Sequence, residues 1–214
     1  MIFTLHMKVW NLTYNRFLLK KNNMKKVIVF ALLLFLEIPV YSAPGTIVTY
    51  TIDPEKNAYN HNNKGVEYLS EKYYYGAIQE FKIAISLNPN TQATAVYFNN
   101  LGKTYLIIGF PELALDCFKN AVKQYSMNFE YYENLAKCYK QLAQTDKQLS
   151  KYKNDVSKNP LNQVMVGLLE EQSGNKRKAI TTFDDFAQSE PNLLITPAIR
   201  QHIKDLVKQI RDEE

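Results

Sequence analysis

The sequence predicts an all-α solenoid, built from about four helical hairpins and closed by a C-terminal helix. The first observation is that small and aromatic residues recur at helical intervals in residues 58–90, before a proline. They are Gly65, Tyr68, Ala77, Phe81, Ala84 and Pro89. The second is that this spacing returns, because a small residue recurs at positions 65, 102, 136 and 167, in steps of 37, 34 and 31 residues. Both observations indicate stacked two-helix units.

The first unit, residues 54–90, carries clear helix signals. Asp53 is a suitable N-cap, Pro54 suits the first helical position, and Glu55 places an acid in the first turn. A second apolar helical pattern runs over residues 73–87 and is broken by Asn88-Pro89-Asn90. Gly65 and the alanines opposite it allow the two backbones to approach closely. A helical hairpin is therefore expected here.

Three further units are predicted at residues 91–127, 128–159 and 160–192. The second keeps the pattern well. In the third, Gln148 and Asp155 occupy the two alanine positions, so a looser hairpin is expected there. In the fourth, Glu170 replaces the aromatic residue that follows the small one, and it lies beside Glu171. Because adjacent helical side chains diverge, this acidic pair is interpreted as part of a solvated face.

Residues 193–214 are expected to form a capping helix with one apolar side. That side is formed by Ile199, Ile203, Leu206, Val207 and Ile210. A repeat array leaves its last apolar face uncovered, and such a helix would cover it. The alternative is a basic amphipathic helix on a membrane surface, but Asp205 and the acidic residues at positions 212–214 dilute its positive charge.

Residues 1–42 are predicted to be a leader. From Met24 the chain has two lysines, an apolar run over 27–36, and small residues at 42–43, which is the plan of a secretory signal peptide. Residues 1–23 would then be an over-extended gene start. Residues 43–53 are expected to form an extended N-terminal arm. The predicted location is the periplasm or the cell exterior, and the alternative is a membrane anchor formed by the uncleaved leader.

Charge patterning gives no support for a nucleic-acid partner. The net charge of +5 arises from residues 1–42, which contain six basic residues and one acidic residue. The remainder of the chain has 26 − 6 = 20 basic and 21 − 1 = 20 acidic residues, so it is formally neutral. If the leader is removed, the reason to expect a polyanionic partner is removed with it.

The sequence offers no catalytic constellation, and no metal or cofactor is expected. Cys117 and Cys138 are interpreted as buried core thiols, although export would permit a disulfide. His61 and His202 have no cysteine or carboxylate at metal-ligand spacing. No nucleophile elbow or phosphate-binding loop is present. We therefore expect a non-catalytic protein.

The repeated pattern resembles the tetratricopeptide repeat (TPR), whose period is about 34 residues. The resemblance covers roughly residues 54–192 and is strongest in the first two units. The tryptophan of the motif is replaced by His61, Phe98, Tyr132 and Gln163 in turn. The resemblance implies a right-handed solenoid of TPR-like hairpins. It also implies a protein–protein interaction module or scaffold whose first helices line a concave groove for a peptide or partner protein.

By position, fourteen residues would line this groove. They are Tyr59, Asn62, Val66, Leu69, Val96, Asn99, Lys103, Leu106, Glu130, Glu133, Lys137, Lys140, Val164 and Leu168. The early groove is apolar with amides and its middle is charged in both signs, which suits an extended peptide with apolar anchors. A structural subunit that self-associates into a homo-oligomer is the alternative function, and a catalytic accessory ranks third.

One known ligand of this family is disfavoured. Some members clamp a C-terminal carboxylate with Lys, Asn, Asn, Lys and Arg on three consecutive repeats. The matching positions here are Asn62, Val66, Asn100, Glu130 and Asn134. Only Asn100 fits, and an acid replaces a required cation, so a carboxylate-terminated tail is not the expected ligand.

Overall fold

The computed structural model describes residues 53–213, and the described residues contain helices and no strands. The predicted leader, and residues 43–52 of the predicted arm, lie outside the described residues. The helices are α3 (Pro54–Ser70), α4 (Tyr74–Leu87), α5 (Gln92–Ile107), α6 (Pro111–Gln124), α7 (Phe129–Gln141), α8 (Thr145–Asn154), a 3-10 turn η1 (Val156–Lys158), α9 (Leu161–Gln172), α10 (Lys176–Ser189) and α11 (Thr196–Glu213). The predicted all-α repeat solenoid is confirmed.

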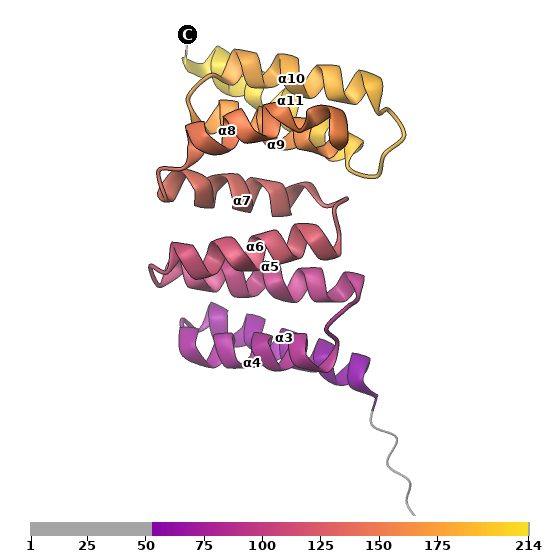
Figure 1. Cartoon of the computed structure of the whole chain (residues 1–214). Helices are drawn as coiled ribbons and strands as arrows, with labels where there is room; N and C mark the ends of the chain where they lie inside the picture. The colour runs from indigo at the N-terminus through magenta and orange to yellow at the C-terminus, as the bar shows by residue number, and fades with distance from the viewer. Residues whose placement is uncertain (1–52, 214) are drawn as a thin grey trace, which may run out of the picture. The chain divides into compact units, whose positions relative to one another are not determined.

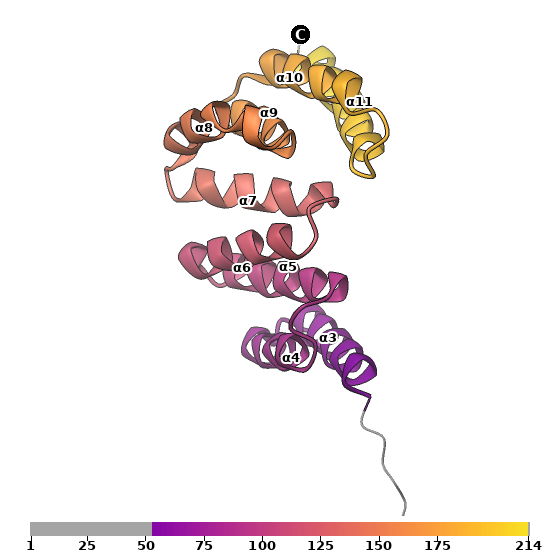
Figure 2. The ribbon, with the colours of Figure 1, turned by 45° about the vertical axis from the view of Figure 1, so that its right-hand side comes forward.

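Successive hairpins of the described region stack on one another, with α11 beside α10 at the far end (Figures 1 and 2). Helices α3 and α4 pack together, as do α5 and α6, and α9 and α10. Helix α4 then packs on α5, and α6 packs on α7. A buried apolar core runs through the stack from Ala77 in α4 to Leu206 in α11. Each helix pair thus covers an apolar face that its neighbour leaves open.

A glycine–phenylalanine contact explains the repeated small residue. A Cβ placed on Gly102 would lie 2.7 Å from Cε1 of Phe118, and one on Gly167 would lie 2.5 Å from Cε1 of Phe183. Both phenylalanines are fully buried, so their rings have no free space into which to move. The first helix of each of these hairpins therefore needs glycine at the point where the aromatic ring of the second helix crosses it.

The third hairpin departs from this plan. Helix α8 has no buried residue, and it packs more on α9 than on its own partner α7. Helix α7 in turn packs directly on α9. The predicted looser hairpin is thus an opened one, because Gln148 and Asp155 give α8 no small apolar face to press against α7. In Figure 2, α8 lies with α9, on the far side of α7 from α6.

Glu170 corrects one expectation from the sequence. Its side chain is 2% exposed, and Oε1 lies 3.0 Å from Nζ of Lys153 in α8 and 3.5 Å from Nζ of Lys178 in α10. The Thr182 hydroxyl donates a 2.7 Å hydrogen bond to Oε2. The interpretation of Glu170 as part of a solvated face was wrong, because its partners come from the two neighbouring helices and not from α9. This buried carboxylate joins α8 to α10.

Helix α11 covers the end of the array. Ile199 and Leu206 are fully buried, Ile203 and Ile210 are half-buried, and Val207 remains exposed. The Arg200 guanidinium donates a hydrogen bond of 3.2 Å to the carbonyl oxygen of Ala187 at the end of α10. Within residues 53–213, no helix combines the length and the apolar character needed to cross a membrane.

The opposite end is closed by a polar cluster. The buried carboxylate of Glu80 lies 2.6 Å from Nδ1 of His61 and 2.7 Å from Nζ of Lys64. Burial raises the pKa of Glu80, but hydrogen bonds from His61 and Lys64 outweigh this and leave the pKa below its usual range. His61 occupies the tryptophan position of the motif. The first repeat therefore presents charge where a repeat in the middle of the array would present an apolar side chain.

Both cysteines are free thiols buried in the core. The Cys138 thiol donates to the carbonyl oxygen of Pro111 at 3.0 Å. Burial raises the pKa of Cys117 to about 12 and that of Cys138 to about 11. Both side chains are therefore protonated, unreactive core residues at neutral pH.

The close contact between Gly102 and Phe118 can be tested by Gly102→Ala. Alanine should gain about 1 kcal/mol from helix propensity, but forcing a methyl group against the ring should cost about 1–3 kcal/mol. We expect a net loss of stability, measured by urea unfolding followed by far-UV circular dichroism. Gly167→Ala should behave alike, and an increase in stability for both variants would contradict the packing described.

The opened third hairpin should be the softest part of the array. Native-state hydrogen exchange should show α8 amides exchanging faster than those of α4 and α6, by about tenfold or more, because none of the residues of α8 is fully buried. The comparison is internal, since all three are second helices of their hairpins. Equal protection in α8 and α6 would show that α8 is held more firmly than its packing indicates.

Candidate functional site

The candidate site is the first-helix face, which we define as the exposed surface of α3, α5 and α7. Tyr59 and Val66 on α3 are 58% and 45% exposed, and Val96 on α5 is 41% exposed. Exposed apolar side chains are costly to leave in water when they gather on one face, so such a face favours contact with a partner. Lys137 and Lys140, both exposed, lie on the last two turns of α7.

The fourteen predicted groove residues fall into three groups in the structure. Five are exposed, namely Tyr59, Val66, Val96, Lys137 and Lys140. Five are half-buried, namely Leu69, Lys103, Leu106, Glu130 and Glu133. Four are buried, namely Asn62, Asn99, Val164 and Leu168. The first two groups are available to a partner, whereas the buried ones have structural roles within the array.

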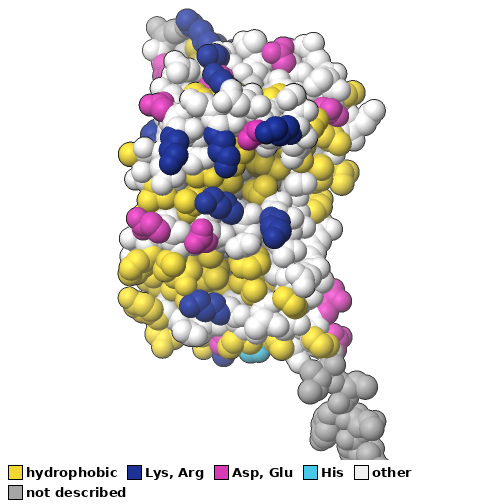
Figure 3. Space-filling model, in the orientation of Figure 1, with side chains coloured by type: hydrophobic (Ala, Val, Ile, Leu, Met, Phe, Trp, Pro, Cys, Tyr) yellow, Lys and Arg dark blue, Asp and Glu magenta, His cyan; other side chains and the backbone are white. Residues whose placement is uncertain are grey.

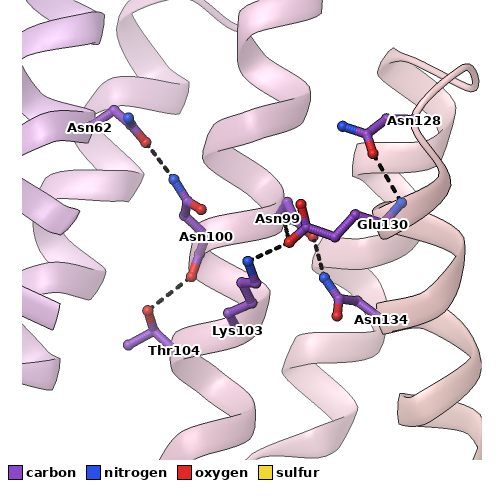
Figure 4. Close-up of polar contacts among 8 residues, drawn as sticks. All are labelled: Asn62, Asn99, Asn100, Lys103, Thr104, Asn128, Glu130 and Asn134. Carbon is purple, nitrogen blue, oxygen red and sulfur yellow. Dashed lines mark hydrogen bonds and ion pairs between the residues drawn. The ribbon is translucent and has the colours of Figure 1, made fainter. Parts of the chain in front are cut away.

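An amide network joins the three first helices (Figure 4). Asn100 on α5 donates a 2.9 Å hydrogen bond to Oδ1 of Asn62 on α3. Asn134 on α7 donates one of 2.9 Å to Oδ1 of Asn99 on α5. The two bonds link the middles of α3, α5 and α7. Amide side chains here fix the spacing of the face and are themselves partly satisfied by one another.

Apolar exposure is not confined to the first helices. Figure 3 shows one side of the described region, on which hydrophobic side chains form bands across the stack, with lysine and arginine side chains between them. On the second helices, Tyr75 of α4 is 71% exposed and Leu113 of α6 is 47% exposed. Side-chain hydrogen bonds join neighbouring first helices directly, and within residues 53–213 none joins α4 to α6. The second helices therefore provide a matched comparison for any test of binding.

Glu130 adds a charge to the amide network. It accepts a hydrogen bond from Nδ2 of Asn99 at 3.3 Å and forms an ion pair with Lys103. Burial raises the pKa of Glu130, but hydrogen bonding and charge from Lys103, with smaller help from Asn99 and Asn134, leave it below its usual range. The carboxylate is thus ionised and neutralised by Lys103. This pair contributes no net charge to the middle of the face.

The face ends at α7 because the C-terminal helix leans toward that helix. The His202 ring on α11 contacts the Phe129 ring of α7, with centroids 5.0 Å apart, and meets the Phe183 ring of α10 edge-on, with centroids 5.5 Å apart. Beyond this contact, Val164 and Leu168 of α9 are 0% and 1% exposed. The structure therefore removes these two predicted residues from the exposed lining. Their positions on the first helix are covered because the array bends tightly at the opened third hairpin.

His202 of α11 also lies close to carboxylates of two other helices, α7 and α9. Its Nε2 lies 2.7 Å from Oε2 of Glu171 on α9, and its Nδ1 lies 4.0 Å from Oε1 of Glu133 on α7. Burial raises the pKa of Glu133, while the positive charges of Lys137 and His202 oppose this rise. Glu133 thus lies near both His202 of α11 and Lys137 of its own helix.

Sequence reasoning missed the carboxylate partners of both histidines. His61 meets Glu80 across a hairpin, and His202 meets Glu171 and Glu133 across two further helices. The expectation from the sequence concerned metal-ligand spacing along the chain, and it did not anticipate these pairs. No local spacing could reveal these pairs, because they depend on which helices become neighbours. Among the described residues, no group of three or more acidic, histidine or cysteine side chains could hold a metal ion.

Together these features define the class of protein as a helical-repeat array with an exposed face on its first helices. A comparison with protein-family models places the tetratricopeptide repeat at residues 58–91, which is the α3–α4 hairpin and the link to α5. The predicted resemblance to the TPR family is confirmed. A comparison with curated protein sequences finds no match.

Solved structures of similar architecture are distant. The structure of MamA protein is 19% identical, with 72% of this chain and 89% of that chain covered and a TM-score of 0.44. A tetratricopeptide repeat protein from Parabacteroides merdae ATCC 43184 is 20% identical, covers 72% and 61% respectively, and has a TM-score of 0.46. The TPR protein TTC0263 from Thermus thermophilus is 22% identical, with 72% and 82% covered and a TM-score of 0.43. Similarities at this level carry no information about partners.

The Lys103–Glu130 pair can be tested by Lys103→Met. Removing the ammonium group should raise the pKa of Glu130, because the largest stabilisation of its ionised form is lost. A carbon-detected NMR titration of the Glu130 carboxyl measures this. Because the folded pKa is lowered, the pair stabilises the protein above the unfolded value, near pH 4.5, and the stabilisation fades as pH falls through the folded value. Lys56→Met, on an exposed lysine at the start of α3, is the control and should leave Glu130 unchanged.

Proposed function

We propose that this protein is an exported, non-catalytic binding module, which holds a peptide or an extended segment of a partner protein on its first-helix face. The observation that carries the proposal is the exposure of Tyr59, Val66 and Val96 on neighbouring first helices. A stable helix needs no apolar side chain on its solvent side. These residues are therefore available to form the apolar centre of an interface.

The rigidity of the face supports the same function. Hydrogen bonds between asparagine side chains hold α3, α5 and α7 in fixed order, and the close hairpin contacts hold each first helix to its partner. A preformed surface loses little conformational entropy when a flexible peptide binds to it. The buried asparagines thus shape the site, while the exposed residues would contact the ligand.

Export rests on the sequence of residues 24–43, with its lysines, apolar run and small residues. The partner would then be an envelope or extracellular protein. A neutral body, with 20 basic and 20 acidic residues after position 42, suits a protein partner better than a nucleic acid.

Site-specific photo-cross-linking in the producing cell tests the proposal. A photoreactive residue replaces Val66 in one variant and Val96 in another, and Lys82, which is exposed on the second helix α4, provides the matched control. We expect a discrete adduct from positions 66 and 96 and none from position 82. Mass spectrometry then identifies the adduct.

The other results would contradict the proposal. Adducts of equal yield from all three positions would show that the first-helix face is not selected. An adduct consisting of two copies of this chain would favour the self-associating structural subunit. Absence of adducts from both positions 66 and 96, in cells that make the folded protein, would reject this face as a binding site.

A further inference from the structure

We propose that the first-helix face binds a peptide that is apolar at one end and acidic at the other, with its acidic end over Lys137 and Lys140. This inference rests on the proposed function and specifies its ligand. The juxtaposition that carries it is an apolar surface on the C-terminal halves of α3 and α5 beside a pair of exposed lysines on the C-terminal half of α7.

The acidic and basic side chains of α5 and α7 are distributed unevenly along the face. Glu130 and Glu133 lie in the N-terminal half of α7, where Lys103 neutralises the first and His202 faces the second. Lys137 and Lys140 lie one and two turns further on, and neither forms an ion pair within residues 53–213. Lys137 lies one turn from Glu133 and opposes the rise in its pKa by charge attraction without forming an ion pair. The C-terminal half of α7 thus carries two exposed positive charges that are not held in ion pairs with described residues.

The apolar surface lies on the two first helices that precede α7. Hydrogen bonds join α3 to α5 and α5 to α7 near the middle of each helix. Val66 is exposed on α3, and the half-buried Leu69 and Leu106 add apolar surface from α3 and α5. The exposed surface is therefore apolar on α3 and α5 and cationic on the C-terminal half of α7. A ligand with the complementary order gains both apolar contact and charge attraction.

The closed end of the array limits the length of ligand in contact. Neighbouring helix axes lie about 8–10 Å apart, so three helices span roughly 20 Å. An extended peptide advances about 3.3 Å per residue, which gives roughly six residues in contact. Beyond α7 the contact of His202 with Phe129 covers the continuation of the face.

The terminal carboxylate of a ligand plays no part in this proposal. The three positions where a carboxylate clamp would place its cations hold Asn62, Glu130 and Asn134, and each of these bonds to a neighbouring helix. The two lysines lie elsewhere on α7, and they would meet side-chain carboxylates. An amidated peptide should therefore bind as well as one with a free C-terminus.

Fluorescence anisotropy with defined probes tests the proposal on the full chain. The probe is a fluorescein-labelled, C-terminally amidated octapeptide with three leucines, one glycine and four alternating aspartates and glutamates. The comparison probe carries lysine in place of each acid. We expect the acidic probe to bind more tightly, and we expect its affinity to fall between 50 and 500 mM salt because screening weakens exposed charge pairs.

Charge reversal locates the site. The double variant Lys137→Glu/Lys140→Glu should weaken binding of the acidic probe on the order of tenfold at low salt. The matched control, Lys82→Glu/Lys119→Glu, changes net charge equally on the second helices α4 and α6 and should leave binding unchanged. Far-UV circular dichroism and thermal unfolding of both variants confirm that each is folded.

Several results would overturn the proposal and can be told apart from failure of the proposed function. Equal binding of the acidic and lysine probes, absence of binding of either probe, or equal effects of the two double variants would reject the acidic ligand. If photo-cross-linking at Val66 and Val96 still captures a partner, the binding face stands and only its ligand chemistry is wrong. If that capture fails as well, the proposed function itself is rejected.

Discussion

The architecture depends on the close crossing of the two helices in the first, second and fourth hairpins. A glycine on the first helix meets the ring of a phenylalanine on the second at Gly65–Phe81, Gly102–Phe118 and Gly167–Phe183. The phenylalanines are fully buried, so each ring fills the space that the missing side chain leaves. This contact sets the distance between helices in a hairpin, and the stack then follows from covering one hairpin with the next.

The third hairpin shows what happens where this contact is lost. Ala136 takes the glycine position and Tyr152 takes the phenylalanine position, and no residue of α8 is fully buried. Helix α8 shifts its packing to α9, and α7 contacts α9 directly. The array therefore bends at this point, α11 approaches α7, and the His202 ring packs against both Phe129 and Phe183. A weak repeat in the sequence thus determines where the first-helix face ends.

Polar side chains add further contacts between the helices. The inter-repeat asparagine bonds, the Lys103–Glu130 pair and the buried Glu170 each connect different helices. Each buried polar atom in these contacts has a partner, which avoids the cost of leaving it without a hydrogen bond. They also separate structural polar residues from those available to a ligand. Asn62 and Asn99 belong to the first kind, and Lys137 and Lys140 to the second.

The sequence by itself determined the repeat architecture, because the recurrence of glycine, aromatic residues, alanine and proline is a local pattern that each hairpin needs. It also identified the face on which Tyr59, Val66 and Val96 are exposed, since helical periodicity decides which side of a helix a residue occupies. Only the tertiary structure decided that Val164 and Leu168 are buried and that Glu170, His61 and His202 have charged partners. Those outcomes depend on how much the stack bends between repeats. That bend is set by packing between helices far apart in the chain, which no local spacing records.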